Sequence, residues 1–234
     1  MHLPSILFPL LCFPLSLLAQ RPPAEEDIPQ ITINSVSAEG TGCPSGTVAI
    51  TIPPDRTIVT LGFDEFQLGV GNGWRSADRQ KTCNIHLNVH YPAGYSYAVI
   101  ETTYHGFAQL DEGVNGVFET EYVFADEEGK GLIGGLLGLI GGLLGSVGDL
   151  LSIVTTVVIT GGGLLADGDS FTVSEKVPIE KVVRSPCEGQ NADMLVKMNV
   201  GLDVQSSGAQ GSLTEDDATI ALEQQMHLEW ERCR

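Results

Sequence analysis

The sequence is poor in positive charge: 12 Lys and Arg residues stand against 30 Asp and Glu residues, a formal net charge of -18. A chain with this charge repels phosphate backbones and anionic lipid headgroups, so we expect no nucleic-acid partner. Charged residues make up 18% of the chain and hydrophobic residues 42%, a balance that excludes wholesale disorder. The 28 Gly and 12 Pro residues argue against an architecture of long helices.

Short motifs of common catalytic and metal sites are also missing. The sequence has no C-x-x-C pair for zinc and no G-x-S-x-G nucleophile elbow. Asp167-Gly168-Asp169 lacks the spacing of a full calcium-binding loop. Acidic pairs such as Asp64-Glu65 are usually solubilising surface in a chain with 30 acids. We therefore predict no catalytic residue, no metal site and no cofactor.

The N-terminal segment has the pattern of a secretory signal peptide. Residues 1–19 form an apolar stretch, and the small residue Ala19 precedes the polar run Gln20-Arg21-Pro22-Pro23. Three prolines interrupt the stretch, which disfavours a membrane anchor. We expect cleavage after Ala19, a secreted, extracellular chain, and a disordered Pro- and acid-rich arm over residues 20–30.

Cysteine usage agrees with secretion. Cys12 leaves with the predicted signal peptide, and four cysteines remain: Cys43, Cys83, Cys187 and Cys233. An even number in a secreted chain indicates two disulfides, with three connectivities open. The spacing favours local closure, Cys43–Cys83 and Cys187–Cys233. Each closure forms a loop of roughly 40 to 47 residues, worth about 4 kcal/mol in the chain-entropy model.

Alternation of apolar and polar residues predicts a succession of β-strands. Residues 83–91 alternate without exception, and in residues 220–230 only Gln224 breaks the apolar stripe. Further strands are predicted over 47–52, 57–63, 95–110, 114–124, 154–160, 171–183 and 194–200. Turn signals separate them, among them Gly71-Asn72-Gly73, Asp111-Glu112-Gly113 and Gly208 to Gly211. We predict an all-β fold over residues 31–234, a single antiparallel, jelly-roll-like β-sandwich stapled by two disulfides.

A set of motifs occurs in an order that resembles the secreted fungal proteins grouped as domain of unknown function 4360. The motifs are Gly42-Cys43-Pro44-Ser45-Gly46-Thr47-Val48, Thr60-Leu61-Gly62-Phe63-Asp64, Asp78-Arg79-Gln80-Lys81-Thr82-Cys83, Leu87-Asn88-Val89-His90-Tyr91-Pro92, Thr103-Tyr104-His105-Gly106-Phe107-Ala108-Gln109-Leu110-Asp111 and Ser185-Pro186-Cys187. The resemblance covers about residues 34–233. It implies a secreted four-cysteine β-sandwich. It does not identify a catalytic residue, a ligand or a substrate.

The sequence departs from the family pattern between Ala125 and Ile153, where the resemblance implies a short polar loop. Gly131-Leu132-Ile133-Gly134-Gly135-Leu136-Leu137 is followed by an identical heptad and a degenerate third, up to residue 151. We expect residues 129–152 to form a helical or irregular insert. On a helix, its glycines would lie on one arc and its large apolar residues on the opposite arc, Leu132, Ile133, Leu136, Leu137, Leu139, Ile140, Leu143 and Leu144.

Four uses of this insert stay open: self-association, contact with a membrane interface, a flap folded onto the sandwich, or a repeat expansion without a selected function. Its small-xxx-small glycine pairs allow close helix contact in lipid. A spanning helix is disfavoured, because strands and cysteines of one extracytoplasmic domain lie on both sides of it.

The function that we expect is non-enzymatic binding outside the cell. Asn84, His86, Asn88 and His90 share one face of a predicted strand and form a candidate binding face for a glycan or cell-wall component. His86 and His90 lie about 13 Å apart by strand rise, too far to share a metal ion unaided. The alternative is a secreted carbohydrate-active hydrolase that uses the same face. Trp74 and Trp230, with Tyr91, Tyr95 and Tyr97, could stack on sugars, although core packing is the commoner use of such residues.

The insert generates a first prediction. Deleting residues 129–152 should leave the β fold intact, because the entropy cost of closing a surface loop depends only weakly on the length of the loop. The deletion should reduce association, since the eight Leu and Ile residues form a large apolar patch if unpartnered. Sedimentation and liposome flotation of the intact and deleted proteins test this. Identical monomeric, lipid-free behaviour of both proteins would reject the association and membrane hypotheses, and loss of folding would place the heptads in the core.

Overall fold

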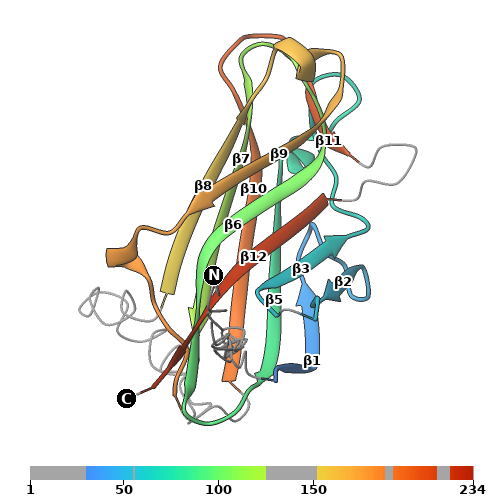
Figure 1. The fold of residues 1–234 in the computed structure, drawn as a ribbon. Helices are drawn as coiled ribbons and strands as arrows, with labels where there is room; N and C mark the ends of the chain where they lie inside the picture. Colours follow the sequence, from blue (N-terminus) through green and yellow to red (C-terminus); the bar gives the residue numbers. More distant parts are fainter. Residues whose placement is uncertain (1–29, 55, 125–151, 188–191, 215–221, 234) are drawn as a thin grey trace, which may run out of the picture.

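The computed structural model describes residues 30–54, 56–124, 152–187, 192–214 and 222–233. The predicted signal peptide, almost all of the 20–30 arm and the heptads lie outside these residues. The described chain forms two antiparallel β-sheets that face each other, which confirms the predicted β-sandwich (Figure 1). Among these residues, none belongs to a helix long and apolar enough to cross a membrane.

One sheet has five strands and the other has seven. The five-stranded sheet has the order β1 (Thr32–Glu39), β5 (Gln80–His90), β10 (Ala192–Val204), β7 (Val114–Phe124) and β8 (Ser152–Thr160). The seven-stranded sheet has the order β2 (Val48–Thr51), β3 (Ile58–Phe63), β12 (Leu222–Arg232), β6 (Tyr95–Leu110), β11 (Gly211–Thr214) and β4 (Leu68–Val70), and β9 (Asp169–Lys176) pairs with β6. The described residues also contain three short 3-10 helices, η1 (Ser76–Arg79), η3 (Gly163–Ala166) and η4 (Ile179–Lys181).

Several boundaries differ from the alternation pattern by a few residues, and three of the differences affect the prediction. The strand predicted over 171–183 ends at Lys176, because Pro178 precedes η4 and cannot donate a ladder hydrogen bond. The predicted turn at Gly208 to Gly211 ends early, since Gly211 already pairs with Leu110 in β11. Ser152, which the prediction assigns to the insert, begins β8 opposite Val123, and the rest of the range 129–152 lies outside the described residues.

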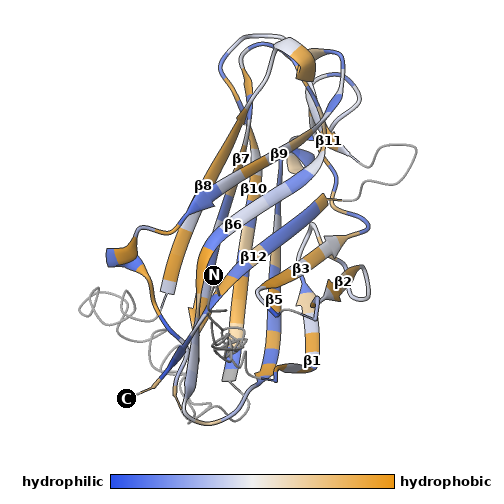
Figure 2. Ribbon diagram, viewed as in Figure 1, coloured by the Kyte–Doolittle hydropathy of each residue, from blue (hydrophilic) through white to orange (hydrophobic). Residues whose placement is uncertain are grey.

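Period-two alternation buries one face of each long strand. In β5, the side chains of Ile85, Leu87 and Val89 point into the sandwich, and the polar residues between them face outward. Figure 2 shows this alternation as hydrophobic and hydrophilic bands along the strands. The rings of Tyr104 on β6 and Phe118 on β7, with centroids 4.7 Å apart, pack the two sheets against each other.

Buried polar side chains also join the two sheets. The Tyr122 hydroxyl on β7 lies 2.7 Å from Thr102 Oγ1 on β6 and accepts a hydrogen bond of 2.7 Å from Gln224 Nε2 on β12. The Tyr104 hydroxyl contacts Thr120 in the same region. Burial raises the pKa of Tyr122, so its hydroxyl stays protonated at neutral pH. Gln224, the exception in the predicted apolar stripe, is therefore a core residue that makes a hydrogen bond.

The disulfides are Cys43–Cys83 and Cys187–Cys233, the two pairs that the spacing favours, with Cα atoms 5.5 and 5.9 Å apart. The second disulfide closes a corner around Gly94, whose N–H donates to the carbonyl of Cys187 and whose carbonyl accepts from the N–H of Cys233. The end of β7 and the start of β8 lie side by side in the five-stranded sheet, because Val123 and Ser152 are paired.

The buried tyrosines generate a matched prediction. Tyr122→Phe should lower the free energy of unfolding by about 1–3 kcal/mol, because Gln224 and Thr102 lose their buried partner. Tyr97→Phe should be neutral or stabilising, because the buried Tyr97 hydroxyl has no hydrogen-bond partner in the described part of the chain. Denaturant unfolding of both variants measures the difference. Equal losses would show that the Tyr122 hydrogen bonds add no net stability.

Candidate functional site

The predicted binding face lies on the solvent side of the five-stranded sheet. Asn84, His86, Asn88 and His90 all point outward from β5, as the alternation predicts. Asn88 Nδ2 donates to Asp193 Oδ1 at 2.6 Å, and its Oδ1 accepts from Asn34 Nδ2 at 3.0 Å. These side-chain hydrogen bonds join β1, β5 and β10. Ligand binding by this face remains a prediction.

Most of the aromatic residues weighed as sugar platforms belong to the core. Tyr91 and Tyr97 are fully buried, and the ring of Trp230 packs against both. Trp230 also donates its Nε1–H to the carbonyl of Arg56 at 3.1 Å. Core packing is thus the main use of these residues. Trp74 differs, because its partly exposed indole lies at a surface pocket.

The pocket beside Trp74 lies on the outer face of the seven-stranded sheet, where β4, β11 and β6 adjoin. Its volume is about 220 Å³. The register aligns Gly69, Ser212 and Gln109 across these three strands. A Cβ at Gly69 would lie 1.9 Å from indole atoms Cδ2 and Cε2 of Trp74, so the ring rests directly on the glycine backbone. The pocket is lined by Val70, Asn72, Trp74, Gln109, Asp111, Gln210, Gly211 and Ser212.

Gln210 holds together the turns that surround this pocket. Its side-chain Oε1 accepts a hydrogen bond of 3.3 Å from the N–H of Asn72. Its backbone N–H donates to Asp111 Oδ2 at 2.8 Å, and its carbonyl accepts from the N–H of Asp111 at 3.0 Å. Gly71, with φ of 102°, turns the chain against the Gln210 side chain, where a Cβ would clash. The three predicted turns at 71–73, 111–113 and 208–211 therefore meet at one place.

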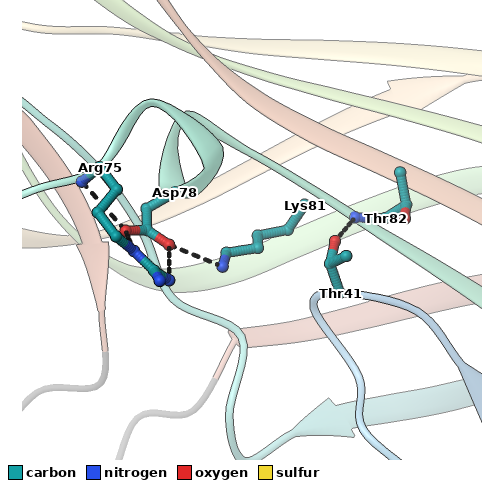
Figure 3. Close-up of polar contacts among 5 residues, drawn as sticks. All are labelled: Thr41, Arg75, Asp78, Lys81 and Thr82. Carbon is teal, nitrogen blue, oxygen red and sulfur yellow. Dashed lines mark hydrogen bonds and ion pairs between the residues drawn. The ribbon is translucent and has the colours of Figure 1, made fainter.

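An ion-pair cluster anchors the chain immediately after Trp74 (Figure 3). Asp78 accepts hydrogen bonds from the backbone N–H of Arg75 at 3.1 Å and from its guanidinium at 3.0 and 3.1 Å. Lys81 Nζ adds a contact of 3.2 Å with the same carboxylate. The side-chain hydrogen bond from Arg75, followed by the one from its backbone, holds the pKa of Asp78 well below its usual range. The cluster also fixes the start of β5, where the N–H of Thr82 donates to Thr41 Oγ1 at 3.0 Å.

A second pocket of about 410 Å³ adjoins the first. The two pockets share Val70, Asn72 and Gln210 as a common wall. The second pocket extends over residues 204–210 toward Arg79. The two pockets therefore lie next to each other. In the described residues, no group of three or more His, Cys, Asp or Glu residues could hold a metal ion.

The chain matches the model of a protein family. Residues 29–233 match the model of domain of unknown function 4360, so the chain belongs to this family. A relative is an uncharacterized secreted protein of Arthroderma benhamiae, 28% identical over 207 residues, which are 88% of this chain and 74% of that protein. The resemblance predicted from the ordered motifs is confirmed.

Among solved structures, similar chains include two carbohydrate-binding modules. One is TmCBM61 in complex with β-1,4-galactotriose, with 10% identity, coverage of 86% of this chain and 90% of that chain, and a TM-score of 0.24. The other is the family 11 module of Clostridium thermocellum with a mixed-linked tetrasaccharide, with 10% identity, coverage of 79% and 91%, and a TM-score of 0.24.

The Asp78 cluster generates a pH prediction. A carboxyl group whose pKa is lower in the folded state stabilises the fold above its unfolded pKa, near 4, and loses this effect as the pH falls toward the folded pKa. The difference in unfolding free energy between the wild type and Asp78→Asn should therefore be constant above about pH 5 and shrink below about pH 4. Denaturant unfolding from neutral to acidic pH measures it, with the exposed Glu180→Gln as the control. A difference that does not change with pH would contradict this role of Asp78.

Proposed function

We propose that this protein is a non-catalytic glycan-binding protein that acts outside the cell, and that the Trp74 pocket holds a sugar ring. One observation carries the proposal: the Trp74 indole rests on the Gly69 backbone at the edge of a pocket with polar walls. The glycine fixes one face of the ring, so the platform is formed before a ligand arrives. Such preorganisation reduces the ordering cost of binding.

The chemistry of the pocket suits a pyranose. A sugar ring has an apolar C–H face, which packs on an aromatic ring, and a rim of hydroxyl groups that need hydrogen-bond partners. Trp74 supplies the apolar surface. Asn72, Gln109 and Ser212 supply both donors and acceptors, and Asp111 supplies an acceptor. The adjoining second pocket gives room for a further ring, so the ligand that we propose is an oligosaccharide.

Charge favours a neutral glycan over an acidic one. The chain carries a formal net charge of -18, and the pocket contains the carboxylate of Asp111. Both repel uronic acids and sulfated sugars. The extracellular setting rests on three features: the predicted signal peptide, the two disulfides, and the secreted relative.

Binding is the better proposal than hydrolysis at this site. Glycosidases commonly use two carboxyl groups on opposite sides of the scissile bond. The residues that line the Trp74 pocket include one carboxylate, Asp111, which already accepts the N–H of Gln210. The hydrolase alternative is tested in the same experiment, by the release of reducing ends from each glycan that binds.

Trp74→Ala should weaken binding to neutral oligosaccharides about tenfold or more, which corresponds to about 1.4 kcal/mol. A glycan array screens the wild-type protein, and isothermal titration with the best ligand compares the variants. The matched control is the double variant His86→Ala and His90→Ala, which alters the face of the opposite sheet. Loss of binding in the histidine variant, with Trp74→Ala unaffected, would move the site to the face predicted from β5. An absence of any glycan ligand would reject the function.

A further inference from the structure

β8 is a sheet edge that lacks the features with which proteins usually block edge pairing. A free edge presents unpaired N–H and C=O groups, and natural proteins protect it with short strands, charges, prolines or bulges. The other described edges have such protection. β2 and β4 contain four and three residues, β1 has a bulge between Ile33 and Ser35, and β9 carries Asp169, Glu175 and Lys176.

β8 has none of these protections. Its nine residues read Ser-Ile-Val-Thr-Thr-Val-Val-Ile-Thr, without charge, Pro or Gly. Its pairing with β7 runs from Ser152 to Thr160 without a register shift. On the outer face, Val154 and Val158 are 56% and 50% exposed. Figure 2 shows hydrophobic residues along much of β8, which forms one side of the five-stranded sheet.

The sequence of β8 is nearly palindromic about Thr156. Residues at equal distances from Thr156 match closely: Val154 with Val158, Ile153 with Ile159, and Ser152 with Thr160. In an antiparallel pair of two copies centred on Thr156, Thr155 faces Val157 on the buried side, and every other residue faces an equivalent one. In an isologous, two-fold interface residue i of one copy contacts residue j of the other and j contacts i, so here most facing side chains match in size and polarity. The outer face would then pair Val154 with Val158 of the other copy, and Thr156 with itself.

From this pattern we infer that the protein forms a two-fold dimer through antiparallel pairing of β8 with β8 of a second copy, which joins the two five-stranded sheets. The occupant is a second copy because β8 is long and carries no charge, so two chains of net charge -18 avoid direct repulsion between facing residues there. The nearest acids on this face are Glu119 and Glu121 of β7. Equivalent acids of the two copies would be separated by three strand spacings, about 14 Å, beyond the screening length of about 8 Å at physiological ionic strength.

The interface is small, so the dimer should dissociate on dilution. Sedimentation velocity of the secreted, disulfide-bonded protein from about 1 µM to about 1 mM should show a shift from monomer to dimer. Thr156→Lys should be monomeric over this range, because two lysines would meet at the two-fold axis. Thr156→Glu should be monomeric for the same reason. Thr156 is exposed, so both variants should keep the fold, which circular dichroism checks.

Charge pairing across the axis gives the decisive measurement. An equimolar mixture of Thr156→Lys and Thr156→Glu should form a heterodimer, because residue 156 faces itself only in the proposed register. Ser37→Lys, on the β1 edge of the same sheet, is the control and should dimerise like the wild type. A wild-type protein that stays monomeric at the highest concentration overturns the inference. So does a dimer that survives Thr156→Lys, or a mixture of the two charged variants that stays monomeric.

Discussion

The hydrogen bonds of Tyr122 with Thr102 and Gln224 set how the two sheets lie on each other. Apolar side chains tolerate small sliding movements, whereas buried hydroxyl and amide groups are satisfied at one alignment only. Tyr122 lies on β7, and its two partners lie on β6 and β12 of the opposite sheet. The turn 111–113 connects β6 to β7, the strands that carry Thr102 and Tyr122, and Asp111 of this turn lies beside Gln210 at the pocket.

Scarcity of positive charge shapes the rest of the surface. Several of the described cations lie against acids of the chain itself: Arg75 and Lys81 with Asp78, Arg79 with Asp203, Lys197 with Glu121, and Arg184 with Glu229 and Glu231. The unbalanced acids then dominate the field around the molecule. In such a field, uncharged surfaces are where close approach of another molecule costs least. The Trp74 indole and β8 are two such surfaces.

Alternation in the sequence predicted most of the fold, because a strand with one buried face must repeat with a period of two. β5, β6, β7 and β8 appear within a few residues of their predicted bounds. The short strands β4 and β11 escaped prediction, since each adjoins a glycine turn, at 71–73 and 208–211, that hides so short an alternation. The position of β8 at the edge of its sheet follows only from the order of the strands, which no local sequence pattern contains.

The candidate site was predictable only in pieces. The turn at Gly71-Asn72-Gly73 and the aromatic Trp74 were visible in the sequence, and so was the Asp78 motif. Their assembly depends on Gln210, which contacts Asn72 across 138 positions of the chain. Gln210 follows a glycine-containing turn and has no distinctive neighbours in the sequence. A long-range side-chain contact of this kind leaves no periodic signal, so residue patterns directed attention to the histidines of β5 instead.

The disulfide between Cys187 and Cys233 has a consequence for local opening of the seven-stranded sheet. β12 lies between β3 and β6, and Cys233 follows its last residue, Arg232. Strands commonly fray from their ends, and such fraying admits solvent to backbone amides without global unfolding. β12 cannot fray from this end unless Cys187 and the Gly94 corner move with it. Amide hydrogens in the second half of β12 are therefore held in a unit that exchanges with solvent only when the whole corner opens.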